Sequence, residues 1–346
     1  MPIVTHNEDL ADHTTLRVGG LADKVVLAQT QDEILATVQE ADAAGTPLLI
    51  LGGGSNVVIA DDGWRGTVLL IRTRGFEVAA DACSGAMVTV QAGEPWDDFV
   101  AECVTREWSG VEALSGIPGT VGATPIQNVG AYGQDVSQTI ASVRTYDRTL
   151  QQIRTFYFAD CEFGYRDSVF KRNPDRYVIL DVSFQLRLDH HSQPVAYPEL
   201  ATSLGVEVGK RSYSDKVRAA VLQLRASKGM VLDPVDHDTW SVGSFFTNPV
   251  VEPAALGSLP ADAPRWPQAD GRLKLSAAWL IENSGHPKGF GLNARVQLSS
   301  KHSLALTNRG TATAGDVMEL AHRIQHDVHE RFGIDLAIEP NLVGEF

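Results

Sequence analysis

Apolar residues recur at helical spacing in four stretches of this chain. The first helix is expected to begin after Thr30, because residues 30–33 fit a capping box, and to end at Gly45. Three more are expected, from about Pro95, over about 214–228 and over about 315–332. The side chains expected to face the core are Ile34, Leu35, Val38 and Ala41 in the first helix, Trp96, Phe99, Val100, Cys103 and Val104 in the second, Val217, Val221 and Leu224 in the third, and Val317, Leu320, Ala321, Ile324 and Val328 in the fourth.

Short apolar runs predict strands between these helices. Residues 47–51 form one such run and 57–60 another, with Gly-rich residues between the two. Residues 136–188 alternate between apolar and polar positions, as strands do. Pro- and Gly-rich residues between 233 and 271 break the pattern, and we place the largest change of domain there. The helices and strands together predict an α/β (or α+β) chain.

The formal net charge of −14 narrows the possible ligands. Nucleic acid is excluded as a non-specific partner, because such binding needs basic patches. An anionic small molecule would need backbone N–H groups, or a few Arg and Lys side chains, gathered locally against the average field. The length of 346 residues predicts two or three domains.

The compartment is indicated by what the sequence lacks. No apolar run approaches the length of a membrane span, and the N-terminal residues lack the basic and apolar regions of a secretion signal. Cys83, Cys103 and Cys161 are odd in number and widely spaced, which fits neither a disulfide framework nor a zinc site. We therefore expect a cytoplasmic protein with no membrane partner.

Two Gly-rich segments are the best candidates for a ligand site. Residues 51–56 (LGGGSN) follow a predicted strand, and adjacent glycines let backbone N–H groups approach a phosphate. A tight turn between two strands would have the same sequence, and the segment matches no standard nucleotide-binding motif. Residues 116–133 hold five glycines and two prolines without a charge, which suits a chain folded round a large, flat ligand, although a structural loop is the alternative. Together the two segments favour a dinucleotide such as FAD, and the polar contacts expected from the second are Thr120, Thr124, Gln127 and Asn128.

Three further motifs carry groups that catalysis uses. Arg166 lies beside an aromatic and a hydroxyl residue, which suits a carboxylate ligand, while an exposed strand with an Arg–Asp pair is the simpler interpretation. Ser244 lies between a glycine and two aromatics and suits a hydroxyl acid, although a turn serine is the default. Glu339 precedes a proline and matters only if the fold returns it to Ser244. We expect no metal site, because no HExxH pattern accompanies the histidines of the last helix, His322, His326 and His329.

Six colinear segments, spread along almost the whole chain, resemble the UDP-N-acetylenolpyruvylglucosamine reductases. They are LGGGSN (51–56), GIPGTVGATPIQNVGAYG (116–133), FGYRDSVFK (163–171), GSFFTNP (243–249), WPQADGRLKLSAAWLIENSG (266–285) and IEP (338–340). The resemblance implies an FAD-binding fold of the vanillyl-alcohol-oxidase (PCMH) type and a third, α/β substrate-binding domain. The implied ranges are 1–72 and 73–225 for the two FAD-binding subdomains and 226–346 for the substrate domain, whose last residues, about 333–346, return to the active site.

The same resemblance implies the activity. Members of the family use bound FAD, with NADPH as co-substrate, to reduce the enolpyruvyl ether of UDP-N-acetylglucosamine to the lactyl ether of UDP-N-acetylmuramate, in peptidoglycan synthesis. NADPH and the sugar nucleotide occupy one site in turn. We expect the chain to act as a monomer.

The family's functional residues carry over to matching positions. Arg166 is implied to stabilise enolate charge, Glu339 to polarise the substrate carboxylate and Ser244 to protonate the carbon that bears the ether oxygen. Tyr197 matches the mobile tyrosine that covers the substrate in one family form. The residues implied for FAD are Gly52, Gly53, Gly54, Ser55, Asn56, Pro118, Gly119, Gly122, Thr124, Asn128 and Gly130. Those implied for the substrate are Tyr165, Tyr197, Lys228, Asn248, Trp266 and His302, with Lys228 and Asn248 at the diphosphate and sugar.

The sequence departs from some relatives at two positions expected to contact the substrate. Trp266 stands where some relatives have Tyr and His302 where some have Gln, so contacts at the nucleotide end are expected to differ while the chemistry stays. A flavin oxidase would share both Gly-rich segments but would not need Ser244 and Glu339 together, and no His or Cys stands suitably near for covalent flavin attachment. A non-catalytic sugar-nucleotide-binding protein would show no flavin spectrum.

Overall fold

A computed structural model describes residues 2–81, 84–257 and 259–346, which form two compact units. Unit 1 contains the residues up to Glu8, together with Ala22–Gly53 and Arg65–Ala226. Unit 2 contains Asp9–Leu21, Gly54–Trp64 and Ser227–Phe346. Cys83 lies outside the described residues, whereas Cys103 and Cys161 are buried thiols outside any disulfide.

The first sheet of unit 1 is made by the N-terminal part of the chain. Its strand order is β1 (Ile3–Asp9), β2 (Leu21–Ala28), β5 (Trp64–Ile71), β3 (Leu48–Leu51). Helix α1 (Gln31–Ala44) joins β2 to β3, and its expected capping box at Thr30 and its expected end at Gly45 are confirmed; Gly45 is left-handed. Strands β3 and β5 are parallel, with Leu51 beside Leu70, so the chain leaves both strands at the same edge of the sheet.

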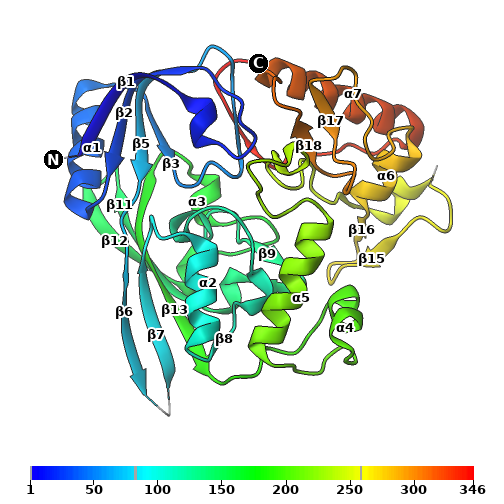
Figure 1. The fold of residues 1–346 in the computed structure, drawn as a ribbon, viewed down its shortest axis with the longest axis horizontal. Helices are drawn as coiled ribbons and strands as arrows, with labels where there is room; N and C mark the ends of the chain where they lie inside the picture. Colours follow the sequence, from blue (N-terminus) through cyan, green and yellow to red (C-terminus); the bar gives the residue numbers. More distant parts are fainter. Residues whose placement is uncertain (1, 82–83, 258) are drawn as a thin grey trace. The chain divides into compact units, whose positions relative to one another are not determined.

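The second sheet of unit 1 carries most of its core. The strand order is β12 (Gln152–Tyr157), β11 (Ile140–Asp147), β13 (Tyr177–Leu188), β7 (Gly85–Gln91), β6 (Phe76–Asp81), and β8 (Trp108–Ser109) pairs with the end of β13. The expected helix after Pro95 is α2 (Trp96–Thr105), which packs on this sheet (Figure 1). The rings of Trp96 and Phe99 lie 5.9 and 5.2 Å from that of Phe184. The strands predicted within 136–188 are confirmed as β11, β12 and β13.

Shorter elements complete unit 1. The third expected helix is α5 (Ser214–Ser227), and its buried Val217 and Val221 pack with Leu200 of α4 (Pro198–Leu204). The other short elements are α3 (Val169–Arg172), β9 (Gly130–Ala131), β10 (Gln134–Asp135) and 3-10 turns at Glu112–Leu114, Val121–Ala123, Val136–Gln138 and Phe158–Cys161.

Unit 2 has a separate core around its longest helix, α7 (Ala314–Phe332). The five side chains expected to face inward from this helix are all buried, and Thr313 and Asp316 form its capping box. Among the described residues, no helix is long and apolar enough to cross a membrane. The remaining elements are the 3-10 turns Leu10–His13, His237–Thr239 and Pro253–Leu256, helix α6 (Ala277–Asn283), the sheet β14 (Val250–Val251), β16 (Leu273–Leu275), β15 (Arg265–Pro267), and the pair β17 (Val296–Leu298) and β18 (Leu306–Asn308).

A pair of parallel strands within unit 2 joins residues from opposite ends of the sequence. Strand β4 (Val57–Ile59) follows the first Gly-rich segment, and it pairs with β19 (Asn341–Val343) near the C-terminus. The pairing places Glu339, two residues before β19, close to the segment that follows the glycines.

Candidate functional site

The first Gly-rich segment begins in unit 1, where β3 ends. A Cβ atom on Gly52 would lie 2.4 Å from Thr120 Oγ1, and one on Gly53 would lie 2.6 Å from the Cα of Gly119. Both contacts are shorter than real Cβ contacts, so a larger residue at either position would push the backbones apart. The two segments singled out in the sequence therefore meet in unit 1, where Gly52 faces the Thr120 side chain and Gly53 faces the Gly119 backbone.

The rest of the same segment lies in unit 2. Gly54 has φ +61°, and a Cβ there would overlap the carbonyl oxygen of His13 at 1.9 Å. The Gly54 carbonyl accepts a hydrogen bond from Thr15 N (3.1 Å), and the Asn56 carbonyl accepts one from Asn341 N (3.0 Å). Main-chain bonds thus hold the residues on either side of Ser55.

The second Gly-rich segment is fixed to the connection between β7 and α2. Gly122 N donates to the Ala92 carbonyl (2.8 Å), and Trp96 N donates to the Gly119 carbonyl (3.0 Å). Buried Thr124 donates its hydroxyl to the Val121 carbonyl (2.8 Å), closing a 3-10 turn. Because Thr124 uses its hydroxyl proton within the turn, any ligand contact it makes uses the oxygen as an acceptor.

Asn128 ties the second segment to the Arg166 motif. It is buried, with left-handed backbone at φ +46°. Its Nδ2 donates to the Gly164 carbonyl (3.1 Å), and its Oδ1 accepts from Ser137 N (3.1 Å). The amide side chain is therefore occupied in holding three pieces of backbone together.

Arg166 lies in the turn that precedes α3, and the exposed strand considered as its simpler interpretation is wrong. Its backbone is left-handed (φ +54°), and its carbonyl accepts a hydrogen bond from Lys171 Nζ (2.9 Å). The guanidinium Nη2 donates to the Gly130 carbonyl (2.9 Å), with Nη1 at 3.4 Å from the Asn128 carbonyl. Arg166 thus contacts the second Gly-rich segment directly.

Ser244 and Glu339 come together in unit 2. Glu339 N donates to the carbonyl of Phe245 (2.9 Å), and Ile338 forms a bridge with Phe246. Gly243, at φ +75°, turns the chain just before Ser244, while the rings of Phe245 and Phe246 are fully buried. Glu339 was of interest only if the fold brought it to Ser244. The fold does bring it to the segment that contains Ser244.

The residues expected at the substrate are distributed over both units. In unit 1, Tyr197 is exposed at the start of α4, with its ring edge-on to Tyr132 at 5.4 Å, and Tyr165 is also exposed. In unit 2, Asn248 caps α6 by accepting from Ala277 N (3.0 Å), and Trp266 is half exposed on β15.

Lys228 and His302 also lie in unit 2, and both are partly buried. Of the three expected catalytic residues, Arg166 belongs to unit 1 and the other two to unit 2.

Two arginines that the sequence did not single out contact the Gly-rich segments in unit 1. Arg225 Nε donates to the Gly116 carbonyl (3.1 Å), and burial lowers its pKa. Arg72 Nη1 donates to the Gly52 carbonyl (2.8 Å). The sequence pointed to such arginines only through its net charge of −14, because an anion site in so acidic a chain needs positive charge gathered locally.

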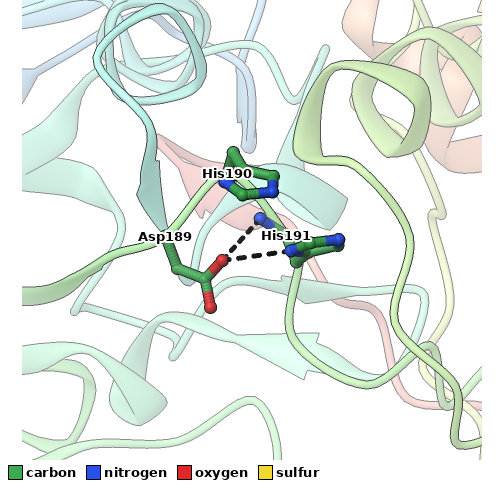
Figure 2. Close-up of side chains that lie close together, drawn as sticks. All are labelled: Asp189, His190 and His191. Atoms are coloured by element: carbon green, nitrogen blue, oxygen red, sulfur yellow. Dashed lines mark hydrogen bonds and ion pairs between the residues drawn. The ribbon is translucent and has the colours of Figure 1, made fainter.

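Asp189, His190 and His191 form a compact group with metal-ligand chemistry (Figure 2). Their candidate ligand atoms lie within 4.8 Å of one another. The carboxylate is already engaged, because one oxygen accepts from His191 N (2.9 Å) and the other pairs with Arg211 (2.6 Å). The His191 backbone bond and then Arg211 lower the pKa of Asp189 to about 2. We interpret the group as structural, because the bonds of Asp189 to His191 and Arg211 stabilise the chain just after β13.

Family models match both ends of the chain. The model for the C-terminal domain of UDP-N-acetylenolpyruvoylglucosamine reductase matches residues 233–343. The model for an FAD-binding domain matches residues 22–154. The first range lies within unit 2, and the second includes the Gly-rich residues of unit 1.

Individual relatives match the whole chain. The UDP-N-acetylenolpyruvoylglucosamine reductase of Cutibacterium acnes is 54% identical, over 97% of this chain and 89% of its own length. That of Thermobifida fusca is 51% identical, over 98% and 97%. Among solved structures, the UDP-N-acetylenolpyruvylglucosamine reductase of Thermus caldophilus matches with a TM-score of 0.64 at 22% identity, covering 99% of both chains, which supports the fold.

Proposed function

The chain belongs to the UDP-N-acetylenolpyruvoylglucosamine reductase family, and from this membership we propose how its own residues divide the work of the reaction. It is an FAD-containing, NADPH-dependent oxidoreductase. It reduces the enolpyruvyl ether of UDP-N-acetylglucosamine to UDP-N-acetylmuramate, a step of peptidoglycan precursor synthesis. The observation that carries this assignment is the identity of 54% along 97% of the chain.

When bound, FAD would supply the hydride chemistry that links NADPH to the enolpyruvyl group. We assign its pyrophosphate to the main chain of residues 52–56, and its remaining contacts to Pro118, Gly119, Gly122, Thr124, Asn128 and Gly130. The close approach of Gly52 and Gly53 to the second segment supports this assignment, since a larger residue at either position would clash with it.

Arg166 and Glu339 act on the substrate carboxylate in this proposal. As hydride reaches the terminal enolpyruvyl carbon, negative charge develops toward the carboxylate, and the Arg166 guanidinium stabilises it. Its hydrogen bonds to backbone carbonyls support this role, because a guanidinium fixed in advance needs little reorganisation during the reaction. Glu339 orients or polarises the same carboxylate by hydrogen bonding.

Ser244 donates the proton that completes the reduction. Its hydroxyl transfers a proton to the carbon that bears the ether oxygen, a strongly basic position once the hydride has arrived. Two features support this role: the apolar setting made by Phe245 and Phe246, and the main-chain bond from Glu339 to Phe245. A serine hydroxyl is a weak acid in water, so shielding from solvent is part of the proposal.

The remaining polar residues hold the sugar nucleotide. Tyr197 covers it, and its exposed position at the end of a loop supports a mobile role. Lys228 and Asn248 bind the diphosphate and sugar, and the cation meets the need for local positive charge. Tyr165, Trp266 and His302 complete the contacts, with NADPH using the same site before the substrate.

The remaining proposals concern organisation. We propose FAD-binding subdomains over 1–72 and 73–225 and a substrate domain over 226–346, with about 333–346 returning to the active site. The FAD-binding and C-terminal family models, at 22–154 and 233–343, support the order of these parts. We also propose a cytoplasmic monomer, and the buried thiols of Cys103 and Cys161 support a reducing compartment.

The Ser244 role is tested by separating the two half-reactions. In Ser244→Ala, reduction of the flavin by NADPH should change by less than about threefold, while oxidation of the reduced flavin by substrate should slow by about 10²- to 10⁴-fold. Thr247→Val is the matched control, because this nearby hydroxyl makes no hydrogen bond to any described residue. Equal losses in both half-reactions would remove Ser244 from the role of proton donor.

A further inference from the structure

Arg72 lies at the edge of the first sheet where the Gly-rich segment begins. Strands β3 and β5 are parallel and end side by side, so the residue after β5 comes next to Gly52. Arg72 Nη1 donates to the carbonyls of Gly52 (2.8 Å) and Ile71 (2.9 Å). The guanidinium is thereby fixed to the first glycine of the segment.

Gly52 is also the point where the second Gly-rich segment comes closest. The position of a Cβ on Gly52 is 2.4 Å from the Thr120 hydroxyl oxygen. Thr73, the next residue after Arg72, accepts a hydrogen bond from Gly93 N at 3.1 Å through its hydroxyl. The cation is therefore bonded to the first residue of the backbone that the proposed function gives to the FAD pyrophosphate.

Within the described part of the chain, the charge on Arg72 has no counter-charge. Its side chain is partly buried, and no carboxylate lies within ion-pair distance among the residues that the structure describes. Burial, and then the neighbouring Arg74 cation, lower the pKa of Arg72. Other partly buried arginines of unit 1 are paired, namely Arg148 with Asp42 (2.6 Å), Arg176 with Asp147 (2.8 Å) and Arg218 with Asp97 (2.5 Å).

A partly buried cation without a partner is costly, and a bound anion removes that cost. Two donor atoms of Arg72, Nε and Nη2, make no hydrogen bond to any described residue, so they are available to such an anion. The Gly52 carbonyl, which would repel a phosphate, is already occupied by Nη1. We propose that Arg72 is the counter-charge for the FAD pyrophosphate and holds the Gly52 carbonyl away from it.

This inference rests on the proposed placement of the pyrophosphate at residues 52–56. The test compares FAD dissociation constants of apo-proteins, measured by flavin fluorescence. Arg72→Gln keeps a donor for the Gly52 carbonyl but removes the charge, and we expect its FAD affinity to fall about 10- to 100-fold. Arg72→Lys keeps the charge and should lose about tenfold or less. Arg74→Met, which removes an exposed cation two residues away, is the matched control and should stay within about twofold of wild type.

A second measurement separates charge compensation from a purely structural role. If Arg72 serves the cofactor, apo Arg72→Gln should melt at or above the temperature of the wild-type apo-protein, because an uncompensated charge has been removed, and FAD should raise its melting temperature less. An apo-protein that loses as much stability as the holoprotein would overturn the proposal. So would FAD binding by Arg72→Gln within twofold of Arg74→Met. A wild-type chain that binds no FAD would instead refute the proposed function itself.

Discussion

At the scale of single residues, part of the backbone strain in unit 1 lies at the proposed site, although Asn7, Glu107, Gln151 and Glu162 are also left-handed. Left-handed backbone is uncommon for residues other than glycine. Asn128, Tyr132 and Arg166 adopt it in unit 1, at φ +46°, +50° and +54°. Each belongs to or contacts the second Gly-rich segment, and hydrogen bonds hold Asn128 and Arg166 in place. Such strain persists where surrounding structure enforces it, and this is common at binding sites.

Asn128→Asp tests whether the hydrogen bonds of the Asn128 side-chain amide hold the second Gly-rich segment in place. Aspartate also tolerates left-handed backbone, but its carboxylate cannot donate to the Gly164 carbonyl and would face that oxygen instead. We expect a loss of about 1–3 kcal/mol in the free energy of unfolding, together with weaker FAD binding. Urea denaturation of the apo-protein measures the first, and fluorescence titration the second. Asn7→Asp is the control, because Asn7 is equally left-handed (φ +53°) but exposed, and a loss there of similar size would contradict the account.

The sequence predicted which residues belong to the proposed site better than it predicted which partners those residues contact. Glycines at 52 and 53 and the pairing of Ser244 with Glu339 follow from motif and resemblance. The partners of Asn128 and Arg72 do not, because Gly164 and Gly52 lie 36 and 20 residues away in the chain. A guanidinium can pair with any carbonyl that the fold brings near, so sequence spacing carries no information about which one.

At the scale of elements, local signals predicted both the long helices and the short strands β3 and β4. The capping box at Thr30 and the apolar spacing of 314–332 act within a few residues, so both helices were predicted with their buried faces. The Arg166 motif was harder, because a turn and an exposed strand have similar composition. Its turn is closed by a backbone bond from Gly164 N to the Asp167 carbonyl (2.9 Å), and Ser168 then caps the short helix α3 by accepting from Lys171 N.

Helix α7 depends on a cap that lies far away in sequence. The Asp61 carboxylate accepts hydrogen bonds from Ala314 N (2.7 Å) and Gly315 N (3.0 Å), at the positive end of the helix. Asp61→Ala should lower the free energy of unfolding by about 1–2 kcal/mol. Chemical denaturation measures the loss, and Asp62→Ala at the neighbouring exposed position should cost less than about 0.5 kcal/mol. Equal effects at the two positions would show that Asp61 does not cap the helix.

The contact between α7 and His286, which lies just after α6, is expected to make stability depend on pH. His286 is buried, with Nε2 at 3.2 Å from the Asp327 carboxylate and Nδ1 at 3.1 Å from Ser284 Oγ. Burial lowers the pKa of His286 below its ordinary 6.5, although Asp327 opposes the shift. The unfolded chain therefore binds a proton more readily than the folded one, and this contribution to stability is complete above pH 6.5 and declines as the pH falls.

Denaturation of the apo-protein at a series of pH values below neutral tests this dependence. His286→Phe should reduce the fall in stability on acidification relative to wild type, because the side chain no longer titrates. His322→Phe is the control, since His322 is exposed on α7 and should leave the slope unchanged. A slope that is the same in all three proteins would contradict the role of His286.

At the scale of the whole molecule, the chain passes from unit 1 into unit 2 and back more than once along the sequence. Residues 9–21 and 54–64 belong to unit 2, although residues on both sides of each stretch belong to unit 1. The parallel pairing of β4 with β19 explains part of this, because it joins residues 57–59 to 341–343. Local periodicity cannot reveal such a pairing, since both strands are three residues long and either would fit several partners. Sequence resemblance, by contrast, implied that the C-terminal residues return to the active site.

As a reductase of this family, the chain transfers reducing equivalents from its flavin to an enolpyruvyl sugar nucleotide. The most direct measurement uses the wild-type holoprotein, reduced anaerobically with NADPH and mixed in a stopped-flow instrument with UDP-N-acetylglucosamine enolpyruvate. The account predicts reoxidation of the flavin without oxygen and one UDP-N-acetylmuramate formed per flavin. A flavin that stays reduced until oxygen is admitted would contradict it and would favour an oxidase.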